Sequence, residues 1–133
     1  MAELHREDVN RPDVVAELTA MYHRYETALM ADDRAVLDTL FWNSPTTIRY
    51  TLTNQNGYDA IKADREATSR GGGAIKREVR RMTVTTYGDA YGTVNVEYFR
   101  PSSRRHGRQS QVWVKFAEDG WRVVSAHVSL LPE

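Results

Sequence analysis

Cysteine is absent from this chain of 133 residues. The absence excludes disulfides, a thiolate nucleophile and cysteine-bound metal sites, and it is typical of a cytosolic protein. Net charge is lacking too, because 18 lysines and arginines balance 18 aspartates and glutamates. A chain without net charge has no overall field that would attract nucleic acid or an anionic membrane.

Long apolar runs are also missing. No run approaches the roughly 20 residues that a membrane span needs, and the charged start MAELHREDVNRPD lacks the apolar core of a secretion signal. We therefore expect a cytoplasmic protein that binds neither a membrane nor nucleic acid. The length suits one domain, so we expect residues 1–133 to form a single domain with a core from about 11 to 131.

Several catalytic and cofactor-binding motifs do not occur. The chain has no HExxH, GxSxG or GxGxxG motif, and no phosphate-binding GxxxxGK motif. Its histidines at 5, 23, 106 and 127 are scattered, with no spacing that would place three around zinc. We expect a protein without a metal or a nucleotide cofactor.

The first half of the chain predicts helices. Residues 12–31 begin with Pro and Asp, which suit a helix start, and carry an apolar stripe at helical spacing: Leu18, Tyr22, Tyr25 and Leu29. Asp32 and Asp33 offer a cap for a second helix over 34–41. Residues 57–69 predict a third helix, which the glycines at 71–73 end.

The second half predicts strands. A short strand covers 46–52, and four segments rich in valine, threonine and aromatic residues follow, at 77–88, 90–101, 107–116 and 120–131. Helices first and hairpin-connected strands last indicate an α+β fold. We expect three helices to cover one face of a curved, mainly antiparallel sheet and to leave a cone with one open mouth.

The strand at 107–116 opens with polar residues on both faces. Alternation puts Arg108 and Ser110 on one face and Gln109, Gln111 and Trp113 on the other. Two interpretations stay open: a strand end exposed to water, or the mouth of a cavity where Arg108, Gln109 and Gln111 donate hydrogen bonds to a small polar ligand.

Two arginine patterns have different interpretations. Arg49 lies within a strand, on the face opposite Ile48 and Tyr50, where it is either a surface residue or a fork that binds a carboxylate. The basic residues at 77, 80 and 81 are interrupted by an acidic one, which favours a solvated strand edge over a nucleic-acid patch.

Several sequence blocks resemble the AtzH and HpxZ type of SnoaL-like protein, within the nuclear transport factor 2-like superfamily. The blocks are Arg24-Tyr25-Glu26, Leu40-Phe41-Trp42, Arg49-Tyr50, 84–88 (VTTYG), 107–114 (GRQSQVWV) and 120–130 (GWRVVSAHVSL). The resemblance spans about residues 11–131. It implies a dimeric α+β cone and a role in the bacterial catabolism of oxalurate or of small urea-like compounds such as those from cyanuric acid.

The resemblance also implies site residues and an activity. Its pocket tyrosine and arginine fall on Tyr25 and Arg49, and one branch is described as hydrolysing 1,3-dicarboxyurea to allophanate beside a partner amidase. We therefore expect a metal-independent amidohydrolase or deaminase in which Arg49 anchors a substrate carboxylate and Tyr25 donates a hydrogen bond or a proton. The alternative for Tyr25 is an ordinary core tyrosine.

Three further residues are candidates for binding substrate: Tyr22, Trp42 and His127. His127 shares a predicted strand face with Ser125 and Ser129, where an imidazole could shuttle protons; a structural histidine is the alternative. With a substrate carboxylate, it is the candidate for activating water.

A non-catalytic partner of an amidase is the alternative function, and an isomerase with an acidic base such as Glu97 has little support. We expect a homodimer that covers aromatic residues on the outer sheet face, with Tyr98, Phe99 and Trp113 as examples.

Overall fold

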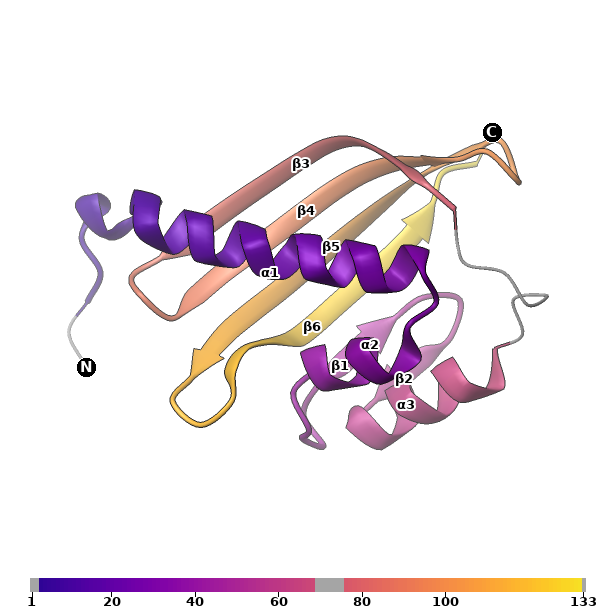
Figure 1. Cartoon of the computed structure of the whole chain (residues 1–133), viewed down its shortest axis with the longest axis horizontal. Helices are drawn as coiled ribbons and strands as arrows, with labels where there is room; N and C mark the ends of the chain where they lie inside the picture. Colours follow the sequence, from indigo (N-terminus) through magenta and orange to yellow (C-terminus); the bar gives the residue numbers. More distant parts are fainter. Residues whose placement is uncertain (1–2, 69–75, 133) are drawn as a thin grey trace.

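The computed structural model describes residues 3–68 and 76–132 (Figure 1). The elements follow in the order α1 (Pro12–Met30), α2 (Arg34–Leu40), β1 (Ile48–Tyr50), β2 (Asn54–Asn56), α3 (Tyr58–Ala67), β3 (Glu78–Tyr87), β4 (Tyr91–Arg100), β5 (Arg105–Phe116) and β6 (Gly120–Leu130). A single 3-10 turn, Arg6–Asp8, precedes α1. The glycines predicted to end the third helix lie outside the described residues.

The helix α1 crosses one face of the sheet (Figure 1). Pro12 stands at its first turn, where a missing N–H costs nothing. The predicted apolar stripe is confirmed, because Leu18, Tyr22, Tyr25 and Leu29 are all buried. Two tyrosines on the buried face bring their hydroxyls into the interior, where each needs a hydrogen-bond partner.

The shorter helices lie beside the β1–β2 end of the sheet (Figure 1). The carboxylate of Asp33 accepts a bond from the Val36 backbone N–H at 3.2 Å, which confirms the predicted cap of α2. The helix α3 begins after Gly57, whose φ of +100° suits glycine.

The six-stranded sheet has the order β2-β1-β6-β5-β4-β3. Neighbouring strands are antiparallel except β1 and β6, which run parallel. The strand β2 was not predicted. It forms because the chain turns at once after β1, and the Gln55 side-chain amide holds this turn by donating to the hydroxyls of Thr51 at 3.1 Å and Thr53 at 2.8 Å.

The predicted alternation of β5 is confirmed. Gln109, Gln111 and Trp113 are buried on the inner face under the helices, whereas Arg108 and Ser110 are exposed on the outer face. The polar start of this strand therefore splits into a buried pair of amides and a solvated outer row. Neither of the two interpretations from the sequence describes both rows.

The face expected for His127 is wrong, and a bulge in β6 is the reason. Val112 pairs with Ser125 and the next residue, Trp113, pairs with Val123, so Val124 is an extra residue in β6. The extra residue shifts the alternation. Trp121 and Val123 are buried on the inner face, and His127 is exposed on the outer face.

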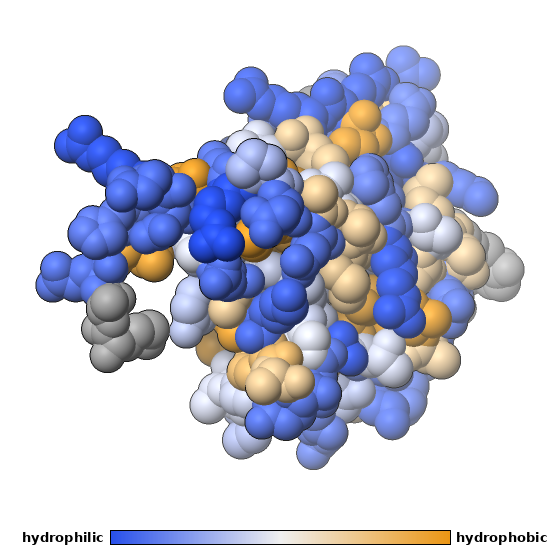
Figure 2. All heavy atoms as spheres, turned by 60° about the vertical axis from the view of Figure 1, so that its left-hand side comes forward, coloured by the Kyte–Doolittle hydropathy of each residue, from blue (hydrophilic) through white to orange (hydrophobic). Residues whose placement is uncertain are grey.

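Two of the aromatic residues expected on the outer face are instead buried inside the molecule. Tyr98 is 3% exposed and Trp113 is fully buried, so neither needs a partner subunit for cover. On the side of the molecule in Figure 2, hydrophobic residues interrupt a mostly hydrophilic surface. Among the described residues, no helix is long and apolar enough to cross a membrane.

Candidate functional site

A buried arginine lies at the centre of a hydrogen-bond network between α1 and the inner sheet face. Arg77 donates to both carboxylate oxygens of Glu26, from Nη2 at 2.7 Å and from Nε at 3.0 Å. It also donates to Gln109 Oε1 at 2.8 Å and to the Tyr22 hydroxyl at 3.1 Å. Its guanidinium lies 4.5 Å from the ring centroid of Tyr98. Every donor nitrogen of this side chain is therefore occupied.

The charges in this network stabilise each other. Burial alone would raise the pKa of Glu26, but the hydrogen bonds and charge of Arg77, with the bond from Tyr22, bring that pKa below its ordinary value of 4.5. Burial alone would lower the pKa of Arg77, and the bonds to Glu26 and the neighbouring tyrosines raise it instead. Both groups are therefore ionised near neutral pH.

The two buried tyrosines, Tyr22 and Tyr25, differ in whether the hydroxyl proton already has an acceptor. The Tyr22 hydroxyl donates to Glu26 at 2.9 Å and accepts from Arg77, so both of its functions are in use. Burial raises the pKa of Tyr22, which keeps it protonated. The Tyr25 hydroxyl accepts a bond from Gln109 Nε2 at 3.0 Å, but its proton has no acceptor among the described residues.

This difference follows from the amide of Gln109. Because Arg77 donates to Oε1, the amide must present Nε2 to Tyr25. Tyr25 can then only accept from Gln109 and must direct its proton elsewhere. Arg77 and Gln109 thus make Tyr25 a proton donor toward the interior.

The predicted anchor, Arg49, lies on the inner face of β1, the strand next to the sheet edge that β2 forms. Its Nη2 donates to Asp64 of α3 at 2.8 Å, and its Nε donates to Gln55 of β2. The side chain is 13% exposed. Asp64 and Gln55 hold the guanidinium in place from two different elements, so its orientation is set before any ligand arrives.

The structure brings four of the predicted residues together and separates one pair that the resemblance implied. Tyr22, Tyr25 and Gln109 share the Arg77 network, and Gln111 lies two residues further along the same inner face. No hydrogen bond joins Tyr25 to Arg49 among the described residues. Any molecule that touches both must lie between them.

Three other predicted residues lie elsewhere. Arg108 and His127 are exposed on the outer face, where the rings of His127 and Tyr50 are perpendicular with centroids 6.2 Å apart. Trp42 stacks on Phe116 with centroids 4.5 Å apart, seven residues beyond Gln109 along β5. Strand geometry makes that separation roughly 23 Å. These three side chains do not face the Tyr25 hydroxyl.

Two buried arginines were missed by the sequence analysis. Arg77 was expected on a solvated edge and is 6% exposed, and Arg65 of α3 is 2% exposed. Arg65 donates to the carboxylate of Asp38 and lies over the Phe41 ring, while its Nε has no partner among the described residues. The sequence contains one signal for the buried Arg77. Glu26 lies beside the apolar stripe of α1, and a carboxylate that is buried there needs a cation as its partner.

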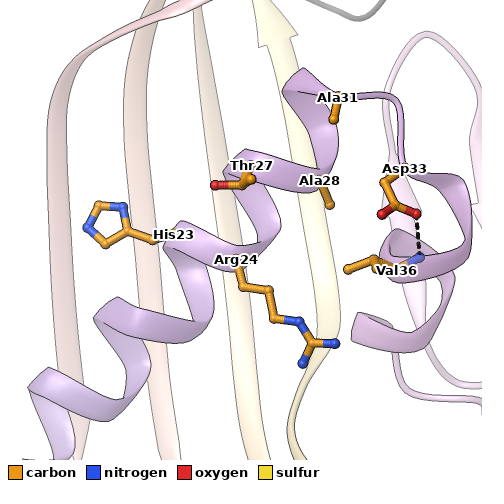
Figure 3. Close-up of a pocket in the computed structure, with 7 residues that line it drawn as sticks. All are labelled: His23, Arg24, Thr27, Ala28, Ala31, Asp33 and Val36. Atoms are coloured by element: carbon orange, nitrogen blue, oxygen red, sulfur yellow. Dashed lines mark hydrogen bonds between the residues drawn. The ribbon is translucent and has the colours of Figure 1, made fainter.

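A separate surface pocket of about 330 Å³ lies in the angle between α1 and α2 (Figure 3). Arg24 reaches from α1 toward α2, while His23 points away. The Asp33 carboxylate is already engaged as the cap of α2. With alanines filling much of the remaining wall, this pocket offers less chemistry than the interior network. Residues 3–68 and 76–132 contain no group of three or more side chains that could hold a metal ion.

Comparison with known proteins gives a match over almost the whole chain. A model of the AtzH-like family matches residues 7–133. No curated protein matches.

Three solved structures show how far the likeness extends. A protein of unknown function from Pectobacterium atrosepticum, of the DUF3225 family, is 43% identical, with a TM-score of 0.92 over 98% of this chain and 100% of that one. A cystatin-like fold protein from Burkholderia xenovorans is 38% identical, with a TM-score of 0.87 over 94% and 97%. A nuclear transport factor 2-like superfamily protein from Salmonella enterica, 23% identical, matches in fold with a TM-score of 0.75 over 91% and 93%.

Proposed function

The chain belongs to the AtzH-like family and has the nuclear transport factor 2-like fold, and from this premise we propose that it hydrolyses small carboxylated urea-type compounds. The observation that carries the proposal is the Tyr25 hydroxyl, which is buried, oriented by Gln109 and left with a proton to donate. Arg49 supplies a preorganised guanidinium on the same inner face.

The reaction needs a proton at the leaving nitrogen. In a carbamate end group, –NH–COO⁻, the C–N bond breaks only when the nitrogen receives a proton, because an amide anion is a poor leaving group. Tyr25 gives that proton, and a water molecule adds its oxygen to the carboxyl carbon and returns one proton to the Tyr25 oxygen. The products are the shortened urea and bicarbonate, so the conversion of 1,3-dicarboxyurea to allophanate releases bicarbonate rather than ammonia.

Arg49 has the complementary role in this scheme. A guanidinium binds a carboxylate through two parallel bonds and stabilises negative charge as it develops at the adjacent carbon. Since His127 faces outward, the group that remains to orient the water is a carboxylate of the substrate itself, which accepts a hydrogen bond from the water while the transferred proton goes to Tyr25. The nearby charge of Arg49 would hold that carboxylate ionised.

The test is release of bicarbonate, without ammonia, from a panel of carboxylated ureas, including 1,3-dicarboxyurea generated in situ. Tyr25→Phe should lower kcat by about 10² to 10⁴. Arg49→Lys keeps the charge but loses the forked geometry and should raise KM. The matched control is Tyr50→Phe, because Tyr50 is an exposed outer-face tyrosine next to Arg49 and its loss should leave turnover unchanged.

Two results would overturn the proposal. One is full activity in Tyr25→Phe. The other is a wild-type protein that releases no bicarbonate yet changes the rate or stability of a partner amidase in a reconstituted mixture, which would make it an accessory protein.

A further inference from the structure

Three residues of neighbouring strands form a row across the inner face of the sheet. Arg49 of β1 pairs with Ala126 of β6, and Ala126 pairs in turn with Gln111 of β5. Directly paired residues project from the same face, so Arg49 and Gln111 lie on either side of Ala126. Two strand spacings separate their Cα atoms by roughly 10 Å.

The Gln111 amide is buried with one end unused. Its Oε1 accepts a bond from the Trp113 indole N–H at 2.9 Å, which identifies the two ends of the amide. Its Nε2 has no partner among the described residues, although the side chain is only 1% exposed. Buried donors in native proteins nearly always have an acceptor, so an unpaired one requires an explanation.

The neighbouring glutamine shows that this state is particular to Gln111. Gln109 uses both ends of its amide, with Oε1 accepting from Arg77 and Nε2 donating to Tyr25. Both glutamines are buried on one strand face, two residues apart. Gln109 is therefore a positioning residue, and Gln111 is available to a ligand.

Ala126 is the residue that lies between the two donors, Arg49 and Gln111, in this row. Its side chain is a single methyl group, whereas the residue on the other side of Gln111 in the same row is Val94. Arg49 is thus separated from Gln111 by the smallest side chain that still has a Cβ.

We propose that Gln111 and Arg49 bind the two ends of one short ligand that carries a hydrogen-bond acceptor at each end, and that Ala126 sets how large this ligand can be. The inference rests on the proposed function and names its substrate class more closely. Arg49 takes one carboxylate, and Gln111 Nε2 donates to the carboxylate or carbonyl at the far end. A compound with only one acceptor end leaves Gln111 unpaired and binds more weakly.

The test is calorimetric titration with two stable probes, glutarate and pentanoate. Both have five-carbon chains, as many backbone atoms as 1,3-dicarboxyurea, and they differ only in the second carboxylate. We expect glutarate to bind wild-type protein at least about tenfold more tightly, the effect of one hydrogen bond to a charged group. In Gln111→Met the preference should vanish while pentanoate binding stays the same.

A second pair of variants tests whether Ala126 limits the size of the ligand. Ala126→Val should abolish glutarate binding, whereas Ser125→Val, an equal kind of change on the exposed outer face of the same strand, should leave it intact. Circular dichroism and thermal unfolding of each variant check the fold. Gln111→Glu serves as the second variant at that position, since it keeps the shape and repels the second carboxylate.

Equal affinity for the two probes in wild-type protein, or a glutarate preference that survives Gln111→Met, would overturn the inference. Because these titrations need no turnover, they are decided separately from the proposed hydrolysis. A protein that binds glutarate through Gln111 but releases no product would keep this inference and refute the enzyme.

Discussion

Replacing Arg77 by methionine tests whether the buried network holds the site together. The side chains of Arg77 and Glu26 are 3% and 17% exposed, and the change removes four hydrogen bonds at once. Breaking a buried ion pair from one side costs about 3 to 5 kcal/mol. Because Glu26 keeps some contact with water, we expect the lower end, about 3 kcal/mol. For a domain of this length that corresponds to roughly a 10 °C drop in Tm.

The loss should depend on pH, with a sign that follows from Glu26. In the wild type the pKa of Glu26 is lowered below 4.5, so its ionised form adds stability at neutral pH that is lost as the pH falls through that lowered pKa. In Arg77→Met, burial, the bond from Tyr22 and the charge of His23 still act on this carboxyl, and the cation that contributed most to lowering its pKa is gone. The difference in stability between wild type and variant should therefore be largest near pH 7 and should shrink toward pH 3.

Urea unfolding at pH 7 and pH 4 measures both effects. The matched control is Arg80→Met, the same change three residues further on, where Arg80 and its partner Glu78 are each 54% exposed. Surface ion pairs contribute about 0 to 1 kcal/mol, so this variant should unfold nearly as the wild type does. Equal losses in the two variants, or a loss in Arg77→Met that does not change with pH, would refute the reasoning.

Other predictions concern packing, capping and assembly. Gly107→Ala should cost about 2 kcal/mol by thermal unfolding, because the added Cβ would lie 2.4 Å from Cζ of Tyr98; an unchanged Tm would contradict this contact. Asp33→Ala should cost about 1 kcal/mol through loss of the α2 cap, with Asp33→Asn as the control that keeps an acceptor. Light scattering should give twice the 15.2 kDa chain mass for a homodimer, and Val112→Glu, on the exposed outer face, should halve it; a monomeric wild type at micromolar concentration would refute assembly.

The fold could be predicted where the pattern is local. The spacing of Leu18, Tyr22, Tyr25 and Leu29 identifies the buried face of α1, and the alternation along β5 places Gln109, Gln111 and Trp113 together on one face, although it does not say that this face is the inner one. Each of these patterns depends only on the period of one element.

The face of β6 could not be predicted by the same means. Its bulge places an extra residue at Val124, directly after another valine, and either valine fits an inner position by its chemistry. The pairing with β5 decides between them, because Trp113 pairs with Val123. Each residue after the bulge therefore lies on the sheet face opposite to the one that an unbroken alternation from Trp121 would give it. A single shifted residue was enough to assign His127 to the wrong face.

The site was only half predictable for a related reason. The sequence placed Tyr22 and Tyr25 on a buried helix face and Gln109 and Gln111 together on one strand face, but it could not tell which of them had hydrogen-bonding capacity to spare. That depends on Arg77, whose partner Glu26 is 51 residues away along the chain.

Arg77 makes a difference between the two tyrosines, Tyr22 and Tyr25, and between the two glutamines, Gln109 and Gln111. It hydrogen-bonds to Tyr22 and Gln109 and not to the other two. Arg77 occupies acceptor atoms of Tyr22 and Gln109, whose polar atoms are all hydrogen-bonded, whereas the proton of Tyr25 and the Nε2 of Gln111 have no partner in the part of the chain that the structure describes. A buried ion pair contributes little to stability compared with apolar packing, and its better-attested role is to specify one arrangement. The Arg77–Glu26 pair has that role here. Arg77 imposes one orientation on the Gln109 amide, and that orientation makes the Tyr25 hydroxyl the acceptor of the bond from Gln109.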